Sequence, residues 1–297
     1  MKISIITPCY NAAATIEETI RSVLDQEGVD LEYIVADGGS NDGTADIIRR
    51  YEARLAWWVS ESDRGQVDAI NKGFTHATGD VLGFLNGDDV LAPGALKAVC
   101  ETFAARPNVE IVQGAVEWID FDGRPLGTHL GDMDCLEDAL NVFKVWWGNR
   151  QWVQPEVFYR RALKEQVGAF DERYHLAFDY DFWVRCFRAG ARVERLSETL
   201  VRFRQHAAQK SVDATRANDE IRTILAENLA DRPEIGARTR WWLRAELSYD
   251  IYQSRKCTGS APRPSFALAL LRHPSWLLSE PVRRRLAEFF GRRPSAR

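Results

Sequence analysis

The stretch VLGFLNGDDVL, residues 81–91, places two adjacent carboxylates directly after a buried apolar run and an Asn-Gly turn. Because Val81 to Leu85 predicts a strand, Asp88 and Asp89 should follow its carboxyl end. Oxygen ligands on a short rigid turn suit Mg²⁺ or Mn²⁺, and these ions usually bind beside substrate phosphates. The same pattern fits a helix N-cap, since Pro93 follows and an Asp there would satisfy free amides. The stretch alone therefore leaves a metal site and a helix cap open.

Short β-rich runs alternate with amphipathic helical patterns on the N-terminal side of this stretch. Strands are predicted at Lys2–Thr7, Leu31–Ala36, Trp57–Val59 and Val81–Leu85, and helices at Ala13–Asp25, Thr44–Tyr51 and Gln66–Ala77. This order predicts an α/β fold with a mostly parallel central sheet and helices on both faces. Ligands of such sheets bind beyond the carboxyl ends of the strands. Residues 7–11, 37–41 and 86–89 should therefore converge on one crevice.

Composition and cysteine content fit a globular protein of the cytoplasm. Of the 297 residues, 45% are apolar and 28% are charged, which are ordinary globular proportions. The length suits one α/β domain with a smaller appended piece. The five cysteines are scattered without CxxC spacing, so we expect reduced thiols rather than a disulfide framework or a zinc site. The apolar core of MKISIITPCYN is too short for a signal peptide, and no stretch reaches membrane-spanning length.

Charge is distributed unevenly along the chain. Residues 261–297 contain eight Arg and two Glu, a net charge of +6, so residues 1–260 carry −10 of the total of −4. Apolar residues separate these arginines, as in an interfacial amphipathic segment. Two interpretations stay open: peripheral contact with an anionic membrane, or an ordinary C-terminal helix with a solvated Arg face. Nucleic acid is not an expected partner, because the body is acidic and carries no recognisable reading motif.

Four segments resemble glycosyltransferase family 2 in their order and spacing: SIITPCYNAAATIEETIRSVLDQ, YIVADGGSNDGTADII, SESDRGQVDAINKGFTHATGDVLGFLNGDD and GAFDERYHLAFDYDFWVR. Neither a GxGxxG after the first strand nor a GxxxxGK[ST] occurs to suggest another nucleotide site. The resemblance implies a GT-A fold, a nucleotide-sugar donor, Mn²⁺ or Mg²⁺, and transfer with inversion. Residues 60–73 are similar to the SExDxGxxDAxNKG pattern of bacterial enzymes of cell-surface polysaccharide assembly. We therefore expect a GT-A domain over 1–211, a helical extension over 212–257 and a basic amphipathic tail over 261–297.

The resemblance implies two groups of donor-binding residues. The group around the nucleoside, in which Asp37 lies nearest the base, comprises Pro8, Tyr10, Asn11 and Asp37. The group along the donor comprises Arg64, Asp68 and Lys72, whose two cations would pair with the diphosphate. The same three charges also fit an exposed helix face that binds nothing. Uridine is the family's commonest base, so a UDP-sugar is the expected donor, although guanosine and thymidine fit the same residues.

The family's metal-binding DxD triplet aligns with Asn86, Gly87 and Asp88, so the first acid is an amide in this chain. The resemblance then makes Asp88 the expected metal ligand, Asn86 a ribose contact, and Asp89 a support of the metal site from a second position. His206 resembles a family His that completes the metal shell, and an imidazole ligand would favour Mn²⁺ somewhat over Mg²⁺. A lone His is as often simply satisfied or exposed.

An inverting transfer needs a general base that takes the proton from the attacking hydroxyl. The segment AFDYDFWVR predicts a helix with Asp179 near its N-terminus, where the helix dipole keeps a carboxylate ionised. By resemblance Asp179 is that base, in a single displacement without a covalent intermediate. The family often has Glu-Asp where this chain has Phe178 and Asp179, so Asp181 would supply the local charge instead. The alternative role of Asp179 is a helix cap.

The remaining regions carry further expectations. Residues 116–133 predict a hairpin around an Asp-Gly turn, and residues 214–252 predict two helices that could cover the sheet or form a homodimer. An aromatic and amide cluster fits either an acceptor pocket for sugar rings or a buried core. It comprises Trp146, Trp147, Asn149, Gln151, Trp152 and Gln154. Lys210 and Ser211 are expected near the phosphates.

The resemblance also implies a glycan or polyprenyl-linked acceptor, reached at the inner face of the plasma membrane. The QxxRW motif of processive synthases is absent, so we expect one sugar per encounter. Two other functions stay open. A nucleotidyltransferase would form pyrophosphate, but it usually carries a glycine-rich first loop that TPCYNA lacks. A catalytically inactive sugar-binding or scaffolding module would fit the amide at position 86.

Overall fold

The structure is a computed structural model that describes residues 1–206, 209, 214–230, 234–258 and 266–289. Lys210 and Ser211 therefore lie outside the described residues. Residue packing divides the chain into two compact units, of which the first comprises Met1–Asp134 and Trp152–Ala217 and the second Cys135–Gln151 and Asn218–Arg297. The domain boundaries expected from the sequence stay predictions. The structure adds one feature to them, because Cys135–Gln151 groups with the C-terminal residues.

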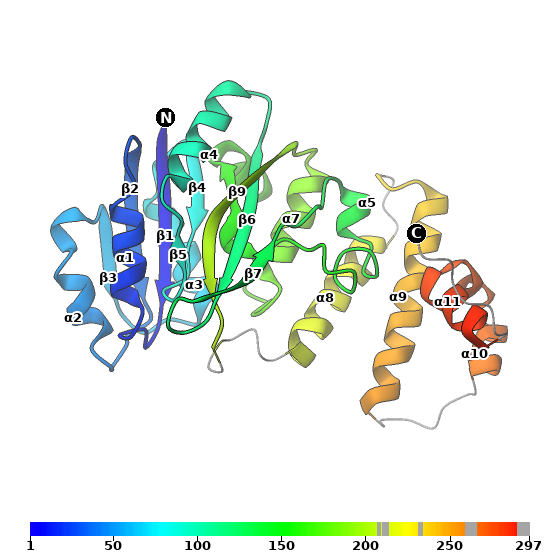
Figure 1. The fold of residues 1–297 in the computed structure, drawn as a ribbon. Coiled ribbons are helices and arrows are strands. Elements are labelled where there is room, and N and C mark those ends of the chain that lie inside the picture. The colour runs from blue at the N-terminus through cyan, green and yellow to red at the C-terminus, as the bar shows by residue number, and fades with distance from the viewer. Residues whose placement is uncertain (207–208, 210–213, 231–233, 259–265, 290–297) are drawn as a thin grey trace. The chain divides into compact units, whose positions relative to one another are not determined.

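Nine strands of the described residues form one sheet in the order β3-β2-β1-β4-β8-β6-β9-β5, with β7 paired to β6 (Figure 1). The strands are β1 Lys2–Cys9, β2 Asp30–Asp37, β3 Trp57–Ser60, β4 Val81–Phe84, β5 Val90–Leu91, β6 Ile111–Ile119, β7 Pro125–His129, β8 Val157–Arg160 and β9 Val193–Arg204. β1 to β4 pair in parallel, as do β6 and β9, whereas β5, β7 and β8 run antiparallel to their neighbours. The expected mostly parallel sheet is confirmed, and β6-β7 is the predicted hairpin.

Helices cover both faces of the parallel strands. Alternate strand residues point to opposite faces, so each strand can contact helices on both sides. In the first unit the helices are α1 Ile16–Leu24, α2 Thr44–Arg49, α3 Gln66–His76, α4 Ala95–Ala105, α6 Arg161–Val167 and α7 Phe178–Arg188, with short turns η1 Glu52–Arg54 and η2 Gln154–Glu156. Ile3 and Ile5 of β1 share one apolar core with α1 and α4. Ile6 faces α3 so closely that a Cβ on Gly73 would lie 2.5 Å from its Cγ2. On that second face, α7 packs its Phe182 ring 5.0 Å from Tyr159 of β8.

Residues 86–89, which we name the acidic turn, do not cap a helix. The turn follows β4 and leads directly into β5, which pairs with β9. Helix α4 begins only at Ala95, after Gly94 in the left-handed conformation with φ 76°. The cap interpretation of Asp88 and Asp89 is therefore wrong, and both carboxylates remain at the end of a parallel strand.

The second unit is helical. Its helices are α5 Leu136–Ala139, most of α8 Ala214–Leu229, α9 Ala237–Thr258, α10 Phe266–Arg272, η4 Pro274–Leu278 and α11 Glu280–Phe289. The two helices predicted within residues 214–252 are thus α8 and the first part of α9. The apolar core of this unit contains Trp276, whose Nε1 donates a hydrogen bond to Ser248 Oγ over 2.6 Å. None of the helices in the described ranges is long and apolar enough to cross a membrane.

Candidate active site

The candidate site lies at the carboxyl ends of β1, β2 and β4. The parallel register pairs Cys9 with Asp37, and β4 pairs in parallel with the other side of β1. Backbone hydrogen bonds join the loops that follow these strands. Gly38 N donates to Cys9 O over 2.9 Å, and Gly87 N donates to Pro8 O over 3.2 Å. The structure therefore brings together the three loops that the sequence predicted to converge.

Asp37 occupies the end of β2 and is almost fully buried. Its carboxylate accepts hydrogen bonds from Ser40 N over 3.1 Å, from the hydroxyls of Ser40 and Ser60, and from Cys9 Sγ over 3.8 Å. Burial, and then the Asp37 charge, raises the pKa of the Cys9 thiol. A carboxylate accepts about four hydrogen bonds. A nucleobase that contacts Asp37 would therefore have to replace one of these donors.

Asn11 joins the loop after β1 to the loop after β2. Its backbone has φ 49°, a left-handed conformation that Asn tolerates better than most residues. Its N–H donates to Ser40 Oγ over 2.7 Å, and its Oδ1 accepts from Asn41 N over 3.1 Å. The neighbouring Tyr10 is 64% exposed, so its ring is accessible to a stacked base. Hydrogen bonds through Ser40 and Asn41 therefore join the loop that carries Tyr10 and Asn11 to the loop after Asp37, and we name these two loops the nucleoside rim.

Asp88 and His206 meet although 118 positions separate them in the sequence. Asp88 Oδ2 lies 3.0 Å from His206 Nε2, and both side chains are partly exposed. One carboxylate and one imidazole form a donor set that suits Mn²⁺. Among the residues that the structure describes, no group of three or more His, Cys, Asp and Glu side chains could hold a metal ion. A cation at this pair would therefore need water or diphosphate oxygens to complete its coordination.

Asp89 is the last residue of the acidic turn, and it is fully buried. Its Oδ1 accepts a hydrogen bond from Arg204 N over 3.0 Å, and its Oδ2 accepts one from Asn86 Nδ2 over 3.0 Å. Burial, and then the neighbouring Asp88 charge, raises the pKa of Asp89, and the two hydrogen bonds oppose that rise. The sequence placed Asp89 among the metal-site residues. In the structure both oxygens of its carboxylate accept hydrogen bonds within the protein, and its place among the metal-site residues stays a prediction.

Asn86 has both polar atoms of its amide engaged within the protein. Its Oδ1 accepts a hydrogen bond from Gln66 Nε2 over 2.7 Å, while its Nδ2 donates to Asp89. Gln66 is the first residue of α3, so this bond ties α3 to the acidic turn. The ribose contact expected for Asn86 would therefore compete with existing bonds. Sequence reasoning did not single out Gln66, since an exposed Gln at a helix start is common.

Arg204, the last residue of β9, holds the acidic turn in place through hydrogen bonds. The sequence did not predict this role. Its side chain is 2% exposed, and its Nη2 lies 2.5 Å from Glu18 Oε2. Its Nε donates to Asp88 O over 2.9 Å and its Nη1 to Phe121 O over 2.6 Å. A buried guanidinium is tolerated when its donors are met in this way. The strand sequence LVRFR does not distinguish this arginine from Arg202, which is more exposed.

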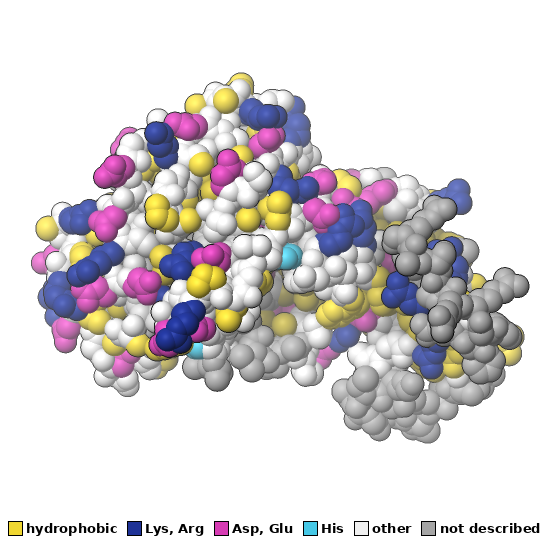
Figure 2. Space-filling view, in the orientation of Figure 1, with side chains coloured by type: hydrophobic (Ala, Val, Ile, Leu, Met, Phe, Trp, Pro, Cys, Tyr) yellow, Lys and Arg dark blue, Asp and Glu magenta, His cyan; other side chains and the backbone are white. Residues whose placement is uncertain are grey.

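The charged residues predicted along the donor are paired with carboxylates. Arg64 lies 2.7 Å from Asp68 and 2.9 Å from Glu172, and Lys72 lies 2.6 Å from Glu61. The hydrogen bond from Arg64 lowers the pKa of Asp68, and the hydrogen bond to Glu61 raises the pKa of Lys72. Over the surface in Figure 2, Lys and Arg side chains similarly lie beside Asp and Glu side chains. A diphosphate would therefore have to compete with these carboxylates for both cations.

Asp179 lies in the first turn of α7, which begins at Phe178, so it is not the N-cap residue. Its Oδ1 accepts a hydrogen bond from Tyr180 N over 2.7 Å. The preceding Phe178 packs against Phe84, the last residue of β4, with ring centroids 6.1 Å apart. This contact places the N-terminus of α7 beside the strand that leads into the acidic turn. The helix dipole there favours an ionised carboxylate.

Asp181 does not replace the missing acidic neighbour of Asp179. It is buried and accepts a hydrogen bond from Arg185 Nε over 2.8 Å. Burial raises the pKa of Asp181, and the charge of Arg185 opposes that rise. Asp181 therefore lies in the first turn of α7 as Asp179 does, but its carboxylate is buried and paired with Arg185.

The aromatic and amide cluster is divided between the two units. Trp146, Trp147, Asn149 and Gln151 belong to the second unit, where Trp147 Nε1 donates to Asp250 Oδ1 over 3.0 Å. Trp152 belongs to the first unit and is buried with its ring 5.5 Å from that of Trp183. Gln154 is also buried and donates from Nε2 to Phe84 O over 3.0 Å. The core interpretation is therefore right for Trp152. The hydrogen bond from Gln154 stabilises the end of β4.

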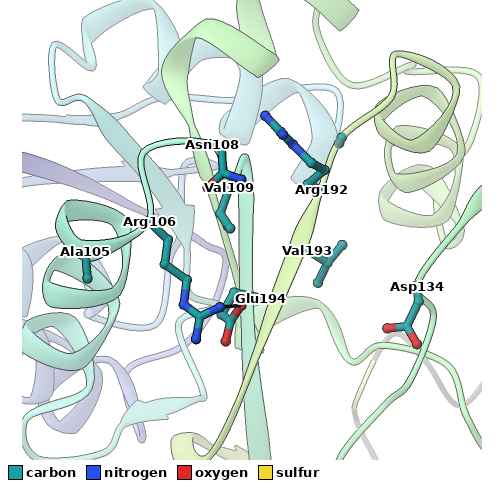
Figure 3. Close-up of a pocket in the computed structure, with 9 residues that line it drawn as sticks. Ala105, Arg106, Asn108, Val109, Asp134, Arg192, Val193 and Glu194 are labelled. Atoms are coloured by element: carbon teal, nitrogen blue, oxygen red, sulfur yellow. Dashed lines mark ion pairs between the residues drawn. The ribbon is translucent and has the colours of Figure 1, made fainter.

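A separate pocket lies away from these residues. It has a volume of about 670 Å³ and is lined by the end of α4 and the residues before and at the start of β9 (Figure 3). Arg106 and Glu194 form an ion pair of 2.9 Å in it. β6 and β9 begin beside this pocket, whereas β1, β2 and β4 end at the candidate site. The pocket and the candidate site therefore lie at opposite ends of the strands. The pocket therefore takes no part in the site.

Comparison with known proteins identifies the family. The family described as Glycosyl transferase family 2 matches residues 4–176. A PGL/p-HBAD biosynthesis glycosyltransferase of Mycobacterium bovis is 33% identical over 202 residues, which cover 67% of this chain and 74% of that protein. An uncharacterized glycosyltransferase of Nostoc sp. is 28% identical over 225 residues, which cover 74% of this chain and 70% of that protein.

Solved structures show the same fold at lower sequence identity. S. aureus TarS 1-349 in complex with UDP-GlcNAc has a TM-score of 0.65 at 19% identity, and the likeness covers 84% of this chain and 72% of that one. The mannosyltransferase PcManGT from Pyrobaculum calidifontis, in complex with GDP-Man and Mn²⁺, has a TM-score of 0.59 at 20% identity over 95% of this chain and 81% of that one. The likeness spans only 43% of a longer TarS chain. The expected GT-A fold is confirmed, and the chain belongs to glycosyltransferase family 2.

Proposed function

We propose that this glycosyltransferase moves one sugar from a nucleoside-diphosphate sugar to an acceptor hydroxyl, with inversion at the anomeric carbon. One observation carries this proposal: the Phe84–Phe178 contact places the first turn of α7, with Asp179, beside the strand that leads to Asp88. A carboxylate base and a metal-binding carboxylate are the two groups that such a displacement requires. Their positions support a single site for both.

Donor binding would use the edge of the sheet from the nucleoside rim to the acidic turn. Tyr10 would stack on the base, with Pro8, Asn11 and Asp37 shaping the rim around it. Arg64 and Lys72 would exchange their carboxylate partners for diphosphate oxygens, and Asp68 would retain part of the Arg64 pairing. Asp88 and His206 would hold Mn²⁺ or Mg²⁺ with Asp89 beneath them. A cation there would neutralise the charge that grows on the leaving diphosphate.

The chemical step would be a direct displacement. Asp179 accepts the proton of the acceptor hydroxyl as its oxygen forms a bond to the anomeric carbon. The bond between that carbon and the diphosphate oxygen breaks on the opposite face, and the nucleoside diphosphate leaves with the electron pair. Asp179 is half-buried in the first turn of a helix, where the helix dipole favours the carboxylate form that can accept a proton.

Features of the second unit and the family resemblance support a proposal for the acceptor and the location. We propose a glycan or polyprenyl-linked acceptor of cell-surface polysaccharide assembly, with the protein in the cytoplasm and attached peripherally to the inner face of the plasma membrane. Leu271 and Leu277 are 79% and 45% exposed, and Arg283 and Arg284 are exposed on α11. Apolar and basic groups of this kind bind anionic lipid surfaces. Charge reversal at Arg283 and Arg284 that leaves sedimentation with anionic vesicles unchanged would contradict the attachment.

Slow hydrolysis of the donor tests the enzymatic part without knowledge of the acceptor, because water can enter in place of the acceptor hydroxyl. UDP-sugars and GDP-sugars are incubated with the protein and Mn²⁺, and the released sugar is followed by NMR before it mutarotates. The proposal predicts that one donor releases a sugar of opposite anomeric configuration and that Asp179→Asn does not. Release with retained configuration would exclude the single displacement.

A further inference from the structure

The side-chain amide of Asn86 helps to compensate for the burial of the Asp89 carboxylate. A carboxylate removed from water is costly unless hydrogen bonds compensate for its lost hydration. Asp89 is fully buried and receives two such bonds, from Arg204 N at Oδ1 and from Asn86 Nδ2 at Oδ2. Asn86 is thus the side-chain donor to this carboxylate, at 3.0 Å.

An aspartate at position 86 could not make this bond. Its oxygens could still accept from Gln66 Nε2, as Asn86 Oδ1 now does over 2.7 Å. It would, however, bring a second carboxylate oxygen to within hydrogen-bond distance of Asp89, with no proton donor between them. Like charges at this distance in a dry interior repel strongly. One of the two side chains would have to move away or take up a proton, and either change removes the present Asn86–Asp89 bond.

Movement of Asp89 would be transmitted to Asp88. Arg204 holds both residues, since its backbone N–H binds the Asp89 side chain and its Nε binds Asp88 O over 2.9 Å. The same turn places Asp88 Oδ2 3.0 Å from His206 Nε2. The geometry of the Asp88–His206 pair therefore depends on the Asp89 side chain keeping its position.

We propose that Asn86 is a positioning residue, which donates to Asp89 so that Asp88 alone faces the metal with His206. This inference rests on the proposed metal-assisted donor site. It has a consequence opposite to the one that the family pattern suggests. Asn86→Asp, which restores the acidic triplet, should weaken metal-dependent nucleotide binding rather than strengthen it.

A swap of the two side chains tests the pairing directly. In Asn86→Asp/Asp89→Asn, the amide at 89 can donate to the carboxylate at 86 and still accept from Arg204 N. Net charge and the number of carboxylates stay the same. The double variant should therefore recover most of what Asn86→Asp loses, which a general disturbance of the turn would not allow. Asn108→Asp is the matched control, because it adds one charge at an exposed residue at the opposite end of the strands.

The experiment is calorimetric titration of UDP and of GDP into each variant, with and without Mn²⁺, together with the thermal unfolding midpoint. We expect Asn86→Asp to lower the Mn²⁺-dependent affinity at least about tenfold, as loss of a group that orients a metal ligand does. Affinity without Mn²⁺ should not change, and Asn108→Asp should resemble the wild type in both measurements. The unfolding midpoint should fall in Asn86→Asp and recover in the swap.

Each other outcome has a distinct meaning. Equal losses with and without Mn²⁺ would show that Asn86 contacts the nucleotide itself, which overturns the inference but not the proposed function. A tighter Mn²⁺-dependent complex in Asn86→Asp, or a swap no better than the single variant, would also overturn it. A wild type that binds neither nucleotide in an Mn²⁺-dependent way would contradict the proposed function, whereas the unfolding midpoints would still decide whether Asn86 and Asp89 are paired.

Discussion

Asp88 and His206 lie 118 positions apart in the sequence, yet Asp88 Oδ2 is 3.0 Å from His206 Nε2. β5 brings them together, because it follows the acidic turn directly and pairs with the end of β9, which leads to His206. The contact therefore comes from sheet topology and not from local sequence. It is the contact at which we propose that a cation binds.

Removal of either partner should weaken Mn²⁺ binding. His206→Ala deletes one of the two ligands that we propose, so we expect the Mn²⁺ affinity of the nucleotide complex to fall about 10- to 100-fold. Asp88→Ala should abolish the metal dependence, since it removes the charged ligand. His76→Ala is the control, because His76 is exposed and stacks on Trp57. Calorimetry that gives the same Mn²⁺ affinity for His206→Ala and the wild type would remove His206 from the site.

Asp179→Asn should affect the chemical step and leave donor binding intact. The amide keeps the shape of the side chain but cannot take a proton, so kcat should fall by about 10²- to 10⁴-fold. The dissociation constant of the donor should stay within experimental error, because the role that we propose for Asp179 is on the acceptor. Asp181→Asn, two residues away, should instead lower the unfolding midpoint through its pair with Arg185. A loss of kcat in Asp181→Asn as large as that in Asp179→Asn would refute the assignment.

Gly87 is required by close packing of the acidic turn on β1. A Cβ at this position would lie 2.7 Å from the Cβ of Cys9, and neither atom can rotate away. Gly87→Ala should therefore displace the turn and lower the free energy of unfolding by about 1–3 kcal/mol. Gly236→Ala, which meets nothing within 4 Å, should show no such loss. Equal unfolding midpoints for the two variants would mean that the turn tolerates the shift.

Glu32 should make the stability of the fold depend on pH in the acid range. Burial alone would raise its pKa, but hydrogen bonds from Lys2, Ser4 and Thr78 lower the pKa of Glu32 to about 2. Because the folded pKa lies below the ordinary value of 4.5, the stabilisation is complete above about pH 4.5 and is lost as pH falls through about 2.

Glu32→Gln should therefore lower the free energy of unfolding by about 2–3 kcal/mol at pH 7, and the difference from the wild type should shrink below pH 4.5. Urea unfolding at a series of pH values measures this difference. The exposed Glu27 offers a matched Glu→Gln control. A difference that stays constant down to pH 2.5 would show that the carboxylate is not held in its charged form.

Local patterns predicted the parallel half of the fold well. The strand–helix alternation up to Val81–Phe84 rests on periodicity and turn residues, which act over a few positions, and the observed elements begin and end near the predicted residues. Antiparallel β8 and the two-residue β5 were not predicted. Their pairing depends on partners far along the chain, which periodicity cannot show.

The candidate site likewise has features that the sequence predicted and features that it could not predict. Strand ends placed Asp37 and Asp88 at one edge of the sheet from sequence alone. The difference between Asp88, which is partly exposed, and Asp89, which is fully buried, could not be predicted from two adjacent identical residues. It is set by Arg204 and Asn86, one of which is distant in the sequence. The pairing of Arg64 and Lys72 with carboxylates likewise depends on contacts that composition does not reveal.

Metal-dependent binding of a nucleoside diphosphate is the central claim, and thermal unfolding tests it most directly. The wild type and Asp88→Ala are heated with UDP, GDP and thymidine diphosphate, each with and without Mn²⁺. A ligand that binds only the folded state raises the midpoint, by an amount that corresponds to about 2.7 kcal/mol at a hundred times its dissociation constant. We predict that one nucleotide raises the midpoint of the wild type, that Mn²⁺ enlarges this shift, and that Asp88→Ala abolishes the Mn²⁺-dependent part. No shift with any nucleotide, or an Mn²⁺ effect that survives in Asp88→Ala, would contradict the account.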